Sequence, residues 1–267
     1  MTEFLYSLLV FVILLGSAAA GLFVRPLLAE HHRAIETVDL VRLVVTMLVT
    51  FAALVLGLLT TSVKASFDTV SGHFRGYAVD IIDLGRTLKE YGPETEPARE
   101  LLRKYTALAI ATTWIDEPPP PGVGVSAGLP HLSPDGDLES RPLGDLLDSI
   151  EVLIRRLDGG DAMHRTLAAD CLSHYRHLIQ DRWVLIEDAH SAIGLPFFIV
   201  LTFWLVIVFA CFGLSAPRNL LVCTVIALGA LSIASAVYVI LDFDTPFTGG
   251  LTIPSQPMRD ALNYLNR

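Results

Sequence analysis

The sequence FLYSLLVFVILLGSAAAGLFV, residues 4–24, decides the class of fold because it contains no charged side chain. Its length is close to the roughly 20 residues that an α-helix needs to cross about 30 Å of hydrocarbon. Three further windows of this kind follow, at about 43–61, 195–214 and 220–241. Because lipid offers the backbone no hydrogen-bond partner, each window is predicted to be a membrane-spanning helix.

A cleaved signal peptide is the alternative for the first window, since Ser17 and the three alanines after it resemble a cleavage site. A signal peptide begins with a positively charged segment, whereas Met1, Thr2 and Glu3 carry no basic side chain. The apolar run is also longer than that of a signal peptide. We therefore expect a retained span, and four spans arranged in two pairs.

The segment between the two pairs is polar and acidic. Residues 64–193 hold 13 Lys and Arg against 21 Asp and Glu, which accounts for −8 of the net charge of −9. Nucleic acids and anionic lipid headgroups bind basic surfaces, so this balance argues against both as charge partners. The expected domains are residues 1–63 with two spans, an extramembrane domain at 64–193, two further spans at 194–241, and an extended C-terminal tail at 242–267.

The extramembrane domain is predicted to consist of helices. Apolar residues recur at steps of three or four from the second span as far as Tyr91, so one amphipathic helix is expected to continue out of the membrane and end at Gly92-Pro93. Further helices are expected at about 97–115, 143–157, 162–193 and 258–265, with a Pro- and Gly-rich loop at about 117–142. The helix at 162–193 can run into the third span. No strand pattern is present, so the fold class is all-α.

The sequence contains no Walker loop, GxGxxG, HExxH or GxSxG motif. His164, Cys171, His174 and His177 lie on one predicted helix, but successive steps of three sweep away from a single face. Packed or solvated histidines are therefore favoured over metal ligands. We expect no enzyme activity, no cofactor and no metal site.

The second span carries one helical face of small and hydroxyl-bearing side chains, here called the small-residue stripe. Its members follow one another at steps of three and four and end in a cation: Thr46, Thr50, Ala53, Gly57, Thr61 and Lys64. Hydroxyl groups can bind water or a partly dehydrated ion, and small side chains leave a lumen open, so the stripe is a candidate pore lining. Helix–helix packing is the alternative, and the pattern alone favours it. A pore would require several copies around an axis.

Two segments resemble signatures of the bacterial bestrophin-like membrane family, which is catalogued largely as a domain of unknown function. FGLSAPRN at 212–219 follows the third span, and LDFDTPFTGGL at 241–251 with PMRDAL at 257–262 follows the fourth. The layout of two spans, soluble helices and two spans also matches over nearly the whole chain. The motif residues, which we expect to have structural roles, are Gly213, Pro217, Arg218, Asn219, Asp242, Asp244, Pro246, Phe247, Gly249, Arg259 and Asp260.

This family is distantly similar to bestrophins, which are pentameric ligand-gated anion channels with a long second helix around the pore; some bacterial members pass cations. The resemblance implies a homo-oligomer, a pentamer, in a bacterial inner membrane, with the lipid bilayer and ions as partners. Bestrophin pores narrow at bulky apolar rings, however, and the stripe is mostly small and hydroxylated. The leading hypothesis is an ion channel or pore, with anions as the candidate ions. The alternative is a non-conducting scaffold or sensor whose helical domain binds a partner or ligand.

Charge in the short loops leaves the orientation open. By the positive-inside rule, Arg25, Arg33, Arg42 and Arg218 place both short loops in the cytoplasm and the central domain outside. Lys64 follows the second span closely, so the central-domain side also has a basic residue next to the membrane, and the charge difference between the two sides is small. The resemblance implies the opposite arrangement, because bestrophins keep their soluble domain in the cytoplasm.

Overall fold

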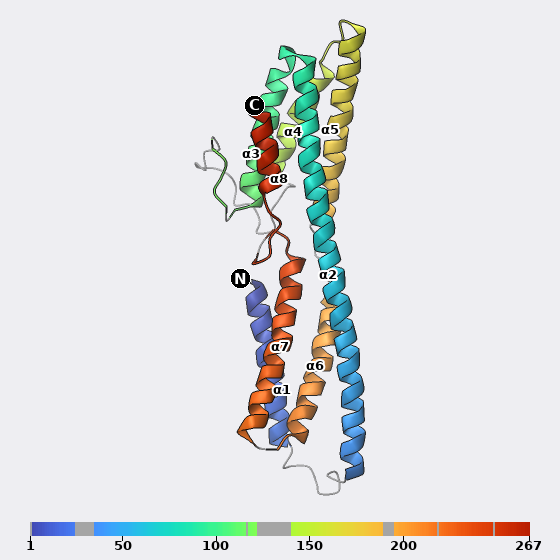
Figure 1. Cartoon of the computed structure of the whole chain (residues 1–267), viewed down its shortest axis with the longest axis vertical. Helices are drawn as coiled ribbons and strands as arrows, with labels where there is room; N and C mark the ends of the chain where they lie inside the picture. Colours follow the sequence, from blue (N-terminus) through green and yellow to red (C-terminus); the bar gives the residue numbers. More distant parts are fainter. Residues whose placement is uncertain are drawn as a thin grey trace. The chain divides into compact units, whose positions relative to one another are not determined.

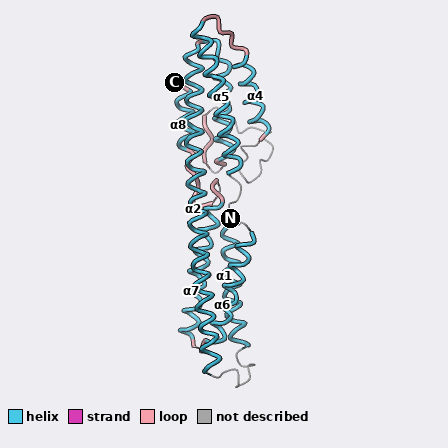
Figure 2. Tube along the Cα trace, turned by 90° about the vertical axis from the view of Figure 1, so that its right-hand side faces the viewer, coloured by secondary structure: helices cyan, strands magenta, loops and turns pink. Residues whose placement is uncertain are grey.

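The computed structural model describes residues 2–24, 35–115, 117–121, 140–188, 195–217, 219–247 and 249–267. Over these residues it contains helices and loops and no strand, as Figure 2 shows. The all-α fold class expected from the sequence is confirmed.

Within the part of the chain that the structure describes, four helices are long and apolar enough to cross a membrane, namely α1, α2, α6 and α7. The elements of the described residues are α1 (Thr2–Val24), α2 (Ile35–Tyr91), the 3₁₀ turn η3 (Pro93–Thr95), α3 (Glu96–Thr113), α4 (Arg141–Arg155), α5 (Ala162–Asp188), α6 (Leu195–Ser215), α7 (Leu220–Asp244) and α8 (Gln256–Leu265). The junction in which the helix at 162–193 was expected to meet the third span lies outside the described residues. Helix α7 continues to Asp244, so the chain is still helical at 242–244, where the sequence suggested an extended tail.

The chain divides into two compact units. The membrane unit comprises Met1–Phe67, Ser191–Thr245 and Gly249–Leu251, and the helical unit comprises Asp68–His190, Pro246–Thr248 and Thr252–Arg267. Helix α2, with 57 residues, contributes to both. At 1.5 Å per residue it is about 85 Å long, far more than a bilayer needs. Its part at 43–61 is uncharged and long enough to span a bilayer, whereas charged side chains recur along its part from Asp68 to Tyr91.

In the membrane unit, α1 lies beside both α6 and α7, as Figure 1 shows. Two glycines permit the close approach of α1 to α6. A Cβ atom at Gly21 would overlap the carbonyl oxygen of Ala210, and one at Gly213 would overlap that of Ala18. Small residues at such crossings let helix backbones come together where lipid supplies no hydrophobic driving force. This contact explains why the motif has a glycine at position 213.

In the helical unit, α3 packs against α4 and α8, and α4 packs against α5. The core contains Tyr77 of α2 and Tyr105 of α3, both fully buried, whose hydroxyl groups are hydrogen-bonded to each other. Buried phenol groups need such a partner because an unpaired hydroxyl in an apolar interior is costly. Gly92, with φ 134°, ends α2 in a conformation that favours glycine.

We predict that Gly21→Val will destabilise the membrane unit, because the added side chain forces α1 away from α6. The expected cost is about 1–3 kcal/mol, the usual range for overpacking. Thermal melting of the purified protein in detergent measures it. Gly16→Val is the matched control on the same helix, since no atom lies within 4 Å of a Cβ at that position. Equal melting temperatures for the two variants would contradict the prediction.

Candidate functional site

The small-residue stripe of α2 lies on the outside of the chain. Each of its six residues is exposed. A Cβ added at Gly57 would meet no atom within 4 Å. Among the described residues, the stripe from Thr46 to Thr61 thus contributes no buried side chain to packing inside one chain, so the packing alternative there concerns contacts with another molecule.

A different face of α2 packs into the membrane unit. Val45, Ala52 and Val63 are buried on it, and partly buried leucines and valines accompany them in the core of α1, α6 and α7: Val41, Leu48, Val55, Leu56 and Leu59. At 100° per residue, the centre of this face is about 150° from the centre of the stripe. Helix α2 thus holds the core with one side and presents the stripe on nearly the opposite side.

The threonine hydroxyl groups of the stripe donate to the backbone of their own helix. Thr46 bonds the carbonyl of Arg42 at 2.8 Å, Thr50 that of Thr46 at 2.9 Å, and Thr61 that of Gly57 at 3.0 Å. In this arrangement the hydroxyl hydrogen is used within the helix, and the oxygen lone pairs remain to accept hydrogen bonds or to coordinate a cation.

Lys64, at the end of the stripe, has aromatic neighbours. Its ammonium nitrogen lies 5.8 Å from the ring centroid of Phe67 and 5.7 Å from that of Phe243. The two rings meet edge to face at 5.2 Å. Both ring faces attract the cation, so these contacts restrain the position of the ammonium group.

After α7 the chain makes a turn that is organised by Asp242. This side chain is 1% exposed and accepts hydrogen bonds from the backbone N–H of Gly250 at 2.8 Å and of Leu251 at 2.9 Å. Gly249 has a φ of 114°, and a Cβ there would overlap the Asp242 carboxylate. The carboxylate thus needs both the left-handed backbone and the absence of a side chain at 249.

In the helical unit, Pro246 and Phe247 are buried. The ring of Phe247 packs edge to face on Phe74 at 5.6 Å and on Trp114 at 6.4 Å. The indole N–H of Trp114 donates to the carbonyl of Ile253 at 2.7 Å. Aromatic packing and one buried hydrogen bond therefore attach the tail segment to the end of α3.

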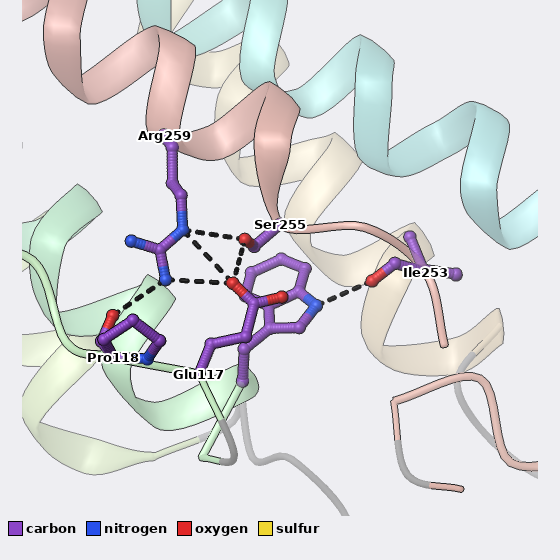
Figure 3. A network of polar contacts seen from close by, with 6 residues as sticks. Glu117, Pro118, Ile253, Ser255 and Arg259 are labelled. Atoms are coloured by element: carbon purple, nitrogen blue, oxygen red, sulfur yellow. Dashed lines mark hydrogen bonds and ion pairs between the residues drawn. The ribbon is translucent and has the colours of Figure 1, made fainter. Parts of the chain in front are cut away.

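Arg259 of α8 is the centre of the polar network in Figure 3. Its guanidinium donates to the Glu117 carboxylate from Nη2 at 2.9 Å and from Nε at 3.2 Å, to the Pro118 carbonyl at 2.9 Å, and to Ser255 Oγ at 2.8 Å. Ser255 in turn donates to the same carboxylate. Charge-assisted hydrogen bonds of this kind are the stronger ones in proteins. The network fixes α8 to the segment that follows α3.

The Bestrophin-like domain model matches residues 11–258. The chain belongs to the Bestrophin-like family. Its fold is also similar to the crystal structure of a point mutant of a bacterial bestrophin homologue from Klebsiella pneumoniae, with a TM-score of 0.61 at 13% identity, covering 97% of this chain and 99% of that one. A search of curated proteins finds no match. The four apolar helices together with the family match make the chain an integral membrane protein.

The remaining motif residues of this Bestrophin-like chain have separate places. Asn219 caps α7, its side-chain oxygen accepting from the N–H of Leu221 at 3.2 Å. Pro217 is exposed and Asp244 is half-buried. Asp260 is exposed and bonds Gln256 at 2.8 Å, within its own helix. Arg218 lies outside the described residues.

Sequence reasoning missed the partners of Arg259. The pattern around Glu117 indicates only the start of a loop, and neither Trp114 nor Ser255 belongs to a motif. Glu117 lies 142 residues before Arg259, and no local pattern connects positions that far apart. The only available signal was the arginine in the tail motif, since a motif arginine at a helix start suggests an acidic partner.

The Bestrophin-like chain also has a cavity of about 560 Å³ in the helical unit, near the end of α2 and the start of α5. Its charged lining residues are Glu94, Arg156, Asp158 and Asp161, and His164 lies beside them. The Tyr91 hydroxyl donates to the Asp158 carbonyl at 2.9 Å. Hydrogen bonds from the His164 backbone and ring hold the pKa of Asp161 below its usual range. Among the residues that the structure describes, no three His, Cys, Asp or Glu side chains are arranged to hold a metal ion.

We predict that Arg259→Gln will release α8, because Glu117 loses its cationic partner. A loss of about 1–3 kcal/mol in unfolding free energy is expected. Thermal melting and limited proteolysis of the tail measure the effect, and a double-mutant cycle with Glu117→Gln isolates the pair. Asp260→Asn, next to Arg259 but outside the network, is the control. Additive effects of Arg259→Gln and Glu117→Gln would show that the two side chains do not act together.

Proposed function

We propose that this Bestrophin-like protein is an oligomeric ion channel of the bacterial inner membrane, lined by the small-residue stripe of α2. The observation that carries the proposal is the exposure of the whole stripe on the side of α2 away from the core. Membership of the Bestrophin-like family supports the same kind of function.

Four spans in one chain are few to surround a conduit, so the proposed pore needs several copies. Rotational symmetry about an axis beside the stripe turns the same six residues of every copy toward that axis. The exposed apolar residues next to the stripe then meet lipid or a neighbouring copy: Leu43, Met47, Phe51, Leu54 and Leu58. By resemblance to bestrophins, the oligomer is a pentamer.

The stripe contains groups that can attract either a cation or an anion. Threonine oxygens whose hydrogens are used in the helix offer acceptors to a passing cation or to water, and the ammonium group of Lys64 offers a positive charge to an anion. The family resemblance favours anions. The reversal potential in a salt gradient distinguishes the two.

We predict that cysteines placed on the stripe will react with a charged methanethiosulfonate reagent during current recording in planar bilayers. Thr50→Cys and Ala53→Cys are expected to lose current on modification, because the adduct fills the lumen. Leu54→Cys is the matched control on the exposed apolar face and is expected to be insensitive. The three native cysteines, Cys171, Cys211 and Cys223, are first replaced by alanine.

Two results would contradict the channel. One is the absence of current at good protein density in the bilayer. The other is equal protection of Thr50→Cys, Ala53→Cys and Leu54→Cys, which would mean that the stripe packs against a second molecule and does not face water.

The cavity in the helical unit favours a second candidate function, that of a ligand-binding sensor. The cavity of about 560 Å³ is large enough for a small organic molecule. Its charged lining has more carboxylates than cations, with Glu94, Asp158 and Asp161 against Arg156. This balance suits a ligand that carries a basic nitrogen.

We predict that a small diamine, with putrescine as the probe, will bind in this cavity. Glu94→Gln is expected to weaken binding about 5- to 10-fold, the equivalent of roughly 1 kcal/mol for one lost charge contact. Isothermal titration with the full chain in detergent measures it. Arg156→Gln is the matched control and is expected to leave affinity unchanged or raise it. Unchanged affinity in Glu94→Gln would place the probe elsewhere.

A further inference from the structure

Two carboxyl groups meet where α2 and α5 run beside each other in the helical unit. The side chains of Asp80 on α2 and Asp181 on α5 lie within hydrogen-bonding reach of each other. Asp181 Oδ2 also lies 3.7 Å from the position of a Cβ on Gly76, one turn before Asp80. Asp181 therefore rests directly against the backbone of α2. Both carboxyl groups are half-buried.

Two carboxyl groups form a hydrogen bond only when one of them carries a proton, because two carboxylates have no hydrogen to share. When both are ionised, two carboxylates within hydrogen-bonding reach repel each other. The contact between α2 and α5 at this point thus has two states, one attractive with a shared proton and one repulsive without it.

The surrounding groups favour retention of the proton. Burial, followed by the hydrogen bond and the charge of Asp181, raises the pKa of Asp80 to about 6, and Asp83 of α2 acts in the same direction. His177 of α5 opposes them. Burial raises the pKa of the Tyr77 and Tyr105 hydroxyl groups, and the positive charge of Arg182 on α5 partly offsets that rise.

A second contact joins the same two helices nearer the end of α5. His73 Nδ1 and Asp188 Oδ2 are 2.5 Å apart. This pair combines an imidazole, which can carry a positive charge, with a carboxylate, so it stays attractive when the carboxylate is ionised. The Asp80–Asp181 pair differs because it has no basic member.

We propose that the Asp80–Asp181 pair is a proton-operated contact that holds α5 against α2 when protonated and loosens it when both carboxyl groups are ionised. The sign follows from the raised pKa of Asp80. The folded state binds the proton more tightly than the unfolded chain does, so stability from this pair is present at low pH and is lost as the pH rises through about 6. This property does not depend on whether the protein conducts ions.

The test measures the separation of α2 and α5 at two pH values. Spin labels are attached to Val79→Cys on α2 and Val184→Cys on α5, both exposed positions, in the full chain with Cys171, Cys211 and Cys223 replaced by alanine. We expect a short, narrow distance distribution at pH 5 and a longer or broader one at pH 7.5. Asp80→Asn and, separately, Asp181→Asn are expected to keep the pH 5 distribution at both pH values, because an amide can donate to the remaining carboxylate at either pH.

Asp83→Asn is the matched control, since Asp83 lies on the same helix and is paired with Arg86 at 3.5 Å. It is expected to retain the pH dependence. Melting temperatures give an independent measure: between pH 5 and 7.5 the wild type should lose about 2–4 °C more than Asp80→Asn does. The same distribution at both pH values in the unsubstituted chain would overturn the proposal, and so would a pH dependence that persists in both asparagine variants.

Discussion

A peptide group in hydrocarbon finds no hydrogen-bond partner except another peptide group, and the fold depends on how four helices meet this requirement. Helix formation satisfies the backbone but brings no attraction between helices, because lipid is as apolar as leucine. Close packing between the helices has to supply that attraction. Gly21 and Gly213 let α1 and α6 approach until backbone touches backbone, and this contact organises the core around which α2 and α7 pack.

The consequence for α2 is an unusual division of its surface. One face is used by the core, and the small-residue stripe remains exposed on nearly the opposite face. Under the proposed function, the exposed threonines and glycine of this face meet water, an ion or a second copy. The channel proposal therefore rests on the exposed stripe and on the family, and it takes an oligomer as the functional unit.

The tail after α7 shows how a few polar groups determine the course of a chain that has left the membrane. Asp242 closes the turn through backbone N–H groups, and Arg259 attaches α8 through Glu117. Asp242 and Arg259 both belong to the tail motifs. The groups that they bind are known only from the structure. The buried carboxylate thus explains the glycine at 249, and the guanidinium explains how α8 is held.

Much of this protein could be predicted from local pattern. Charge-free windows identified the spans, periodicity identified the continuous helix as far as Tyr91, and the steps along 46–64 identified the stripe, because each of these signals is carried by neighbouring residues. Contacts between distant residues required the tertiary structure. The sequence could not pair Arg259 with Glu117 or Asp80 with Asp181, nor assign Gly21 to the α1–α6 crossing. Such partners are chosen by how helices pack, and that choice is made by the summed contacts of whole helix faces.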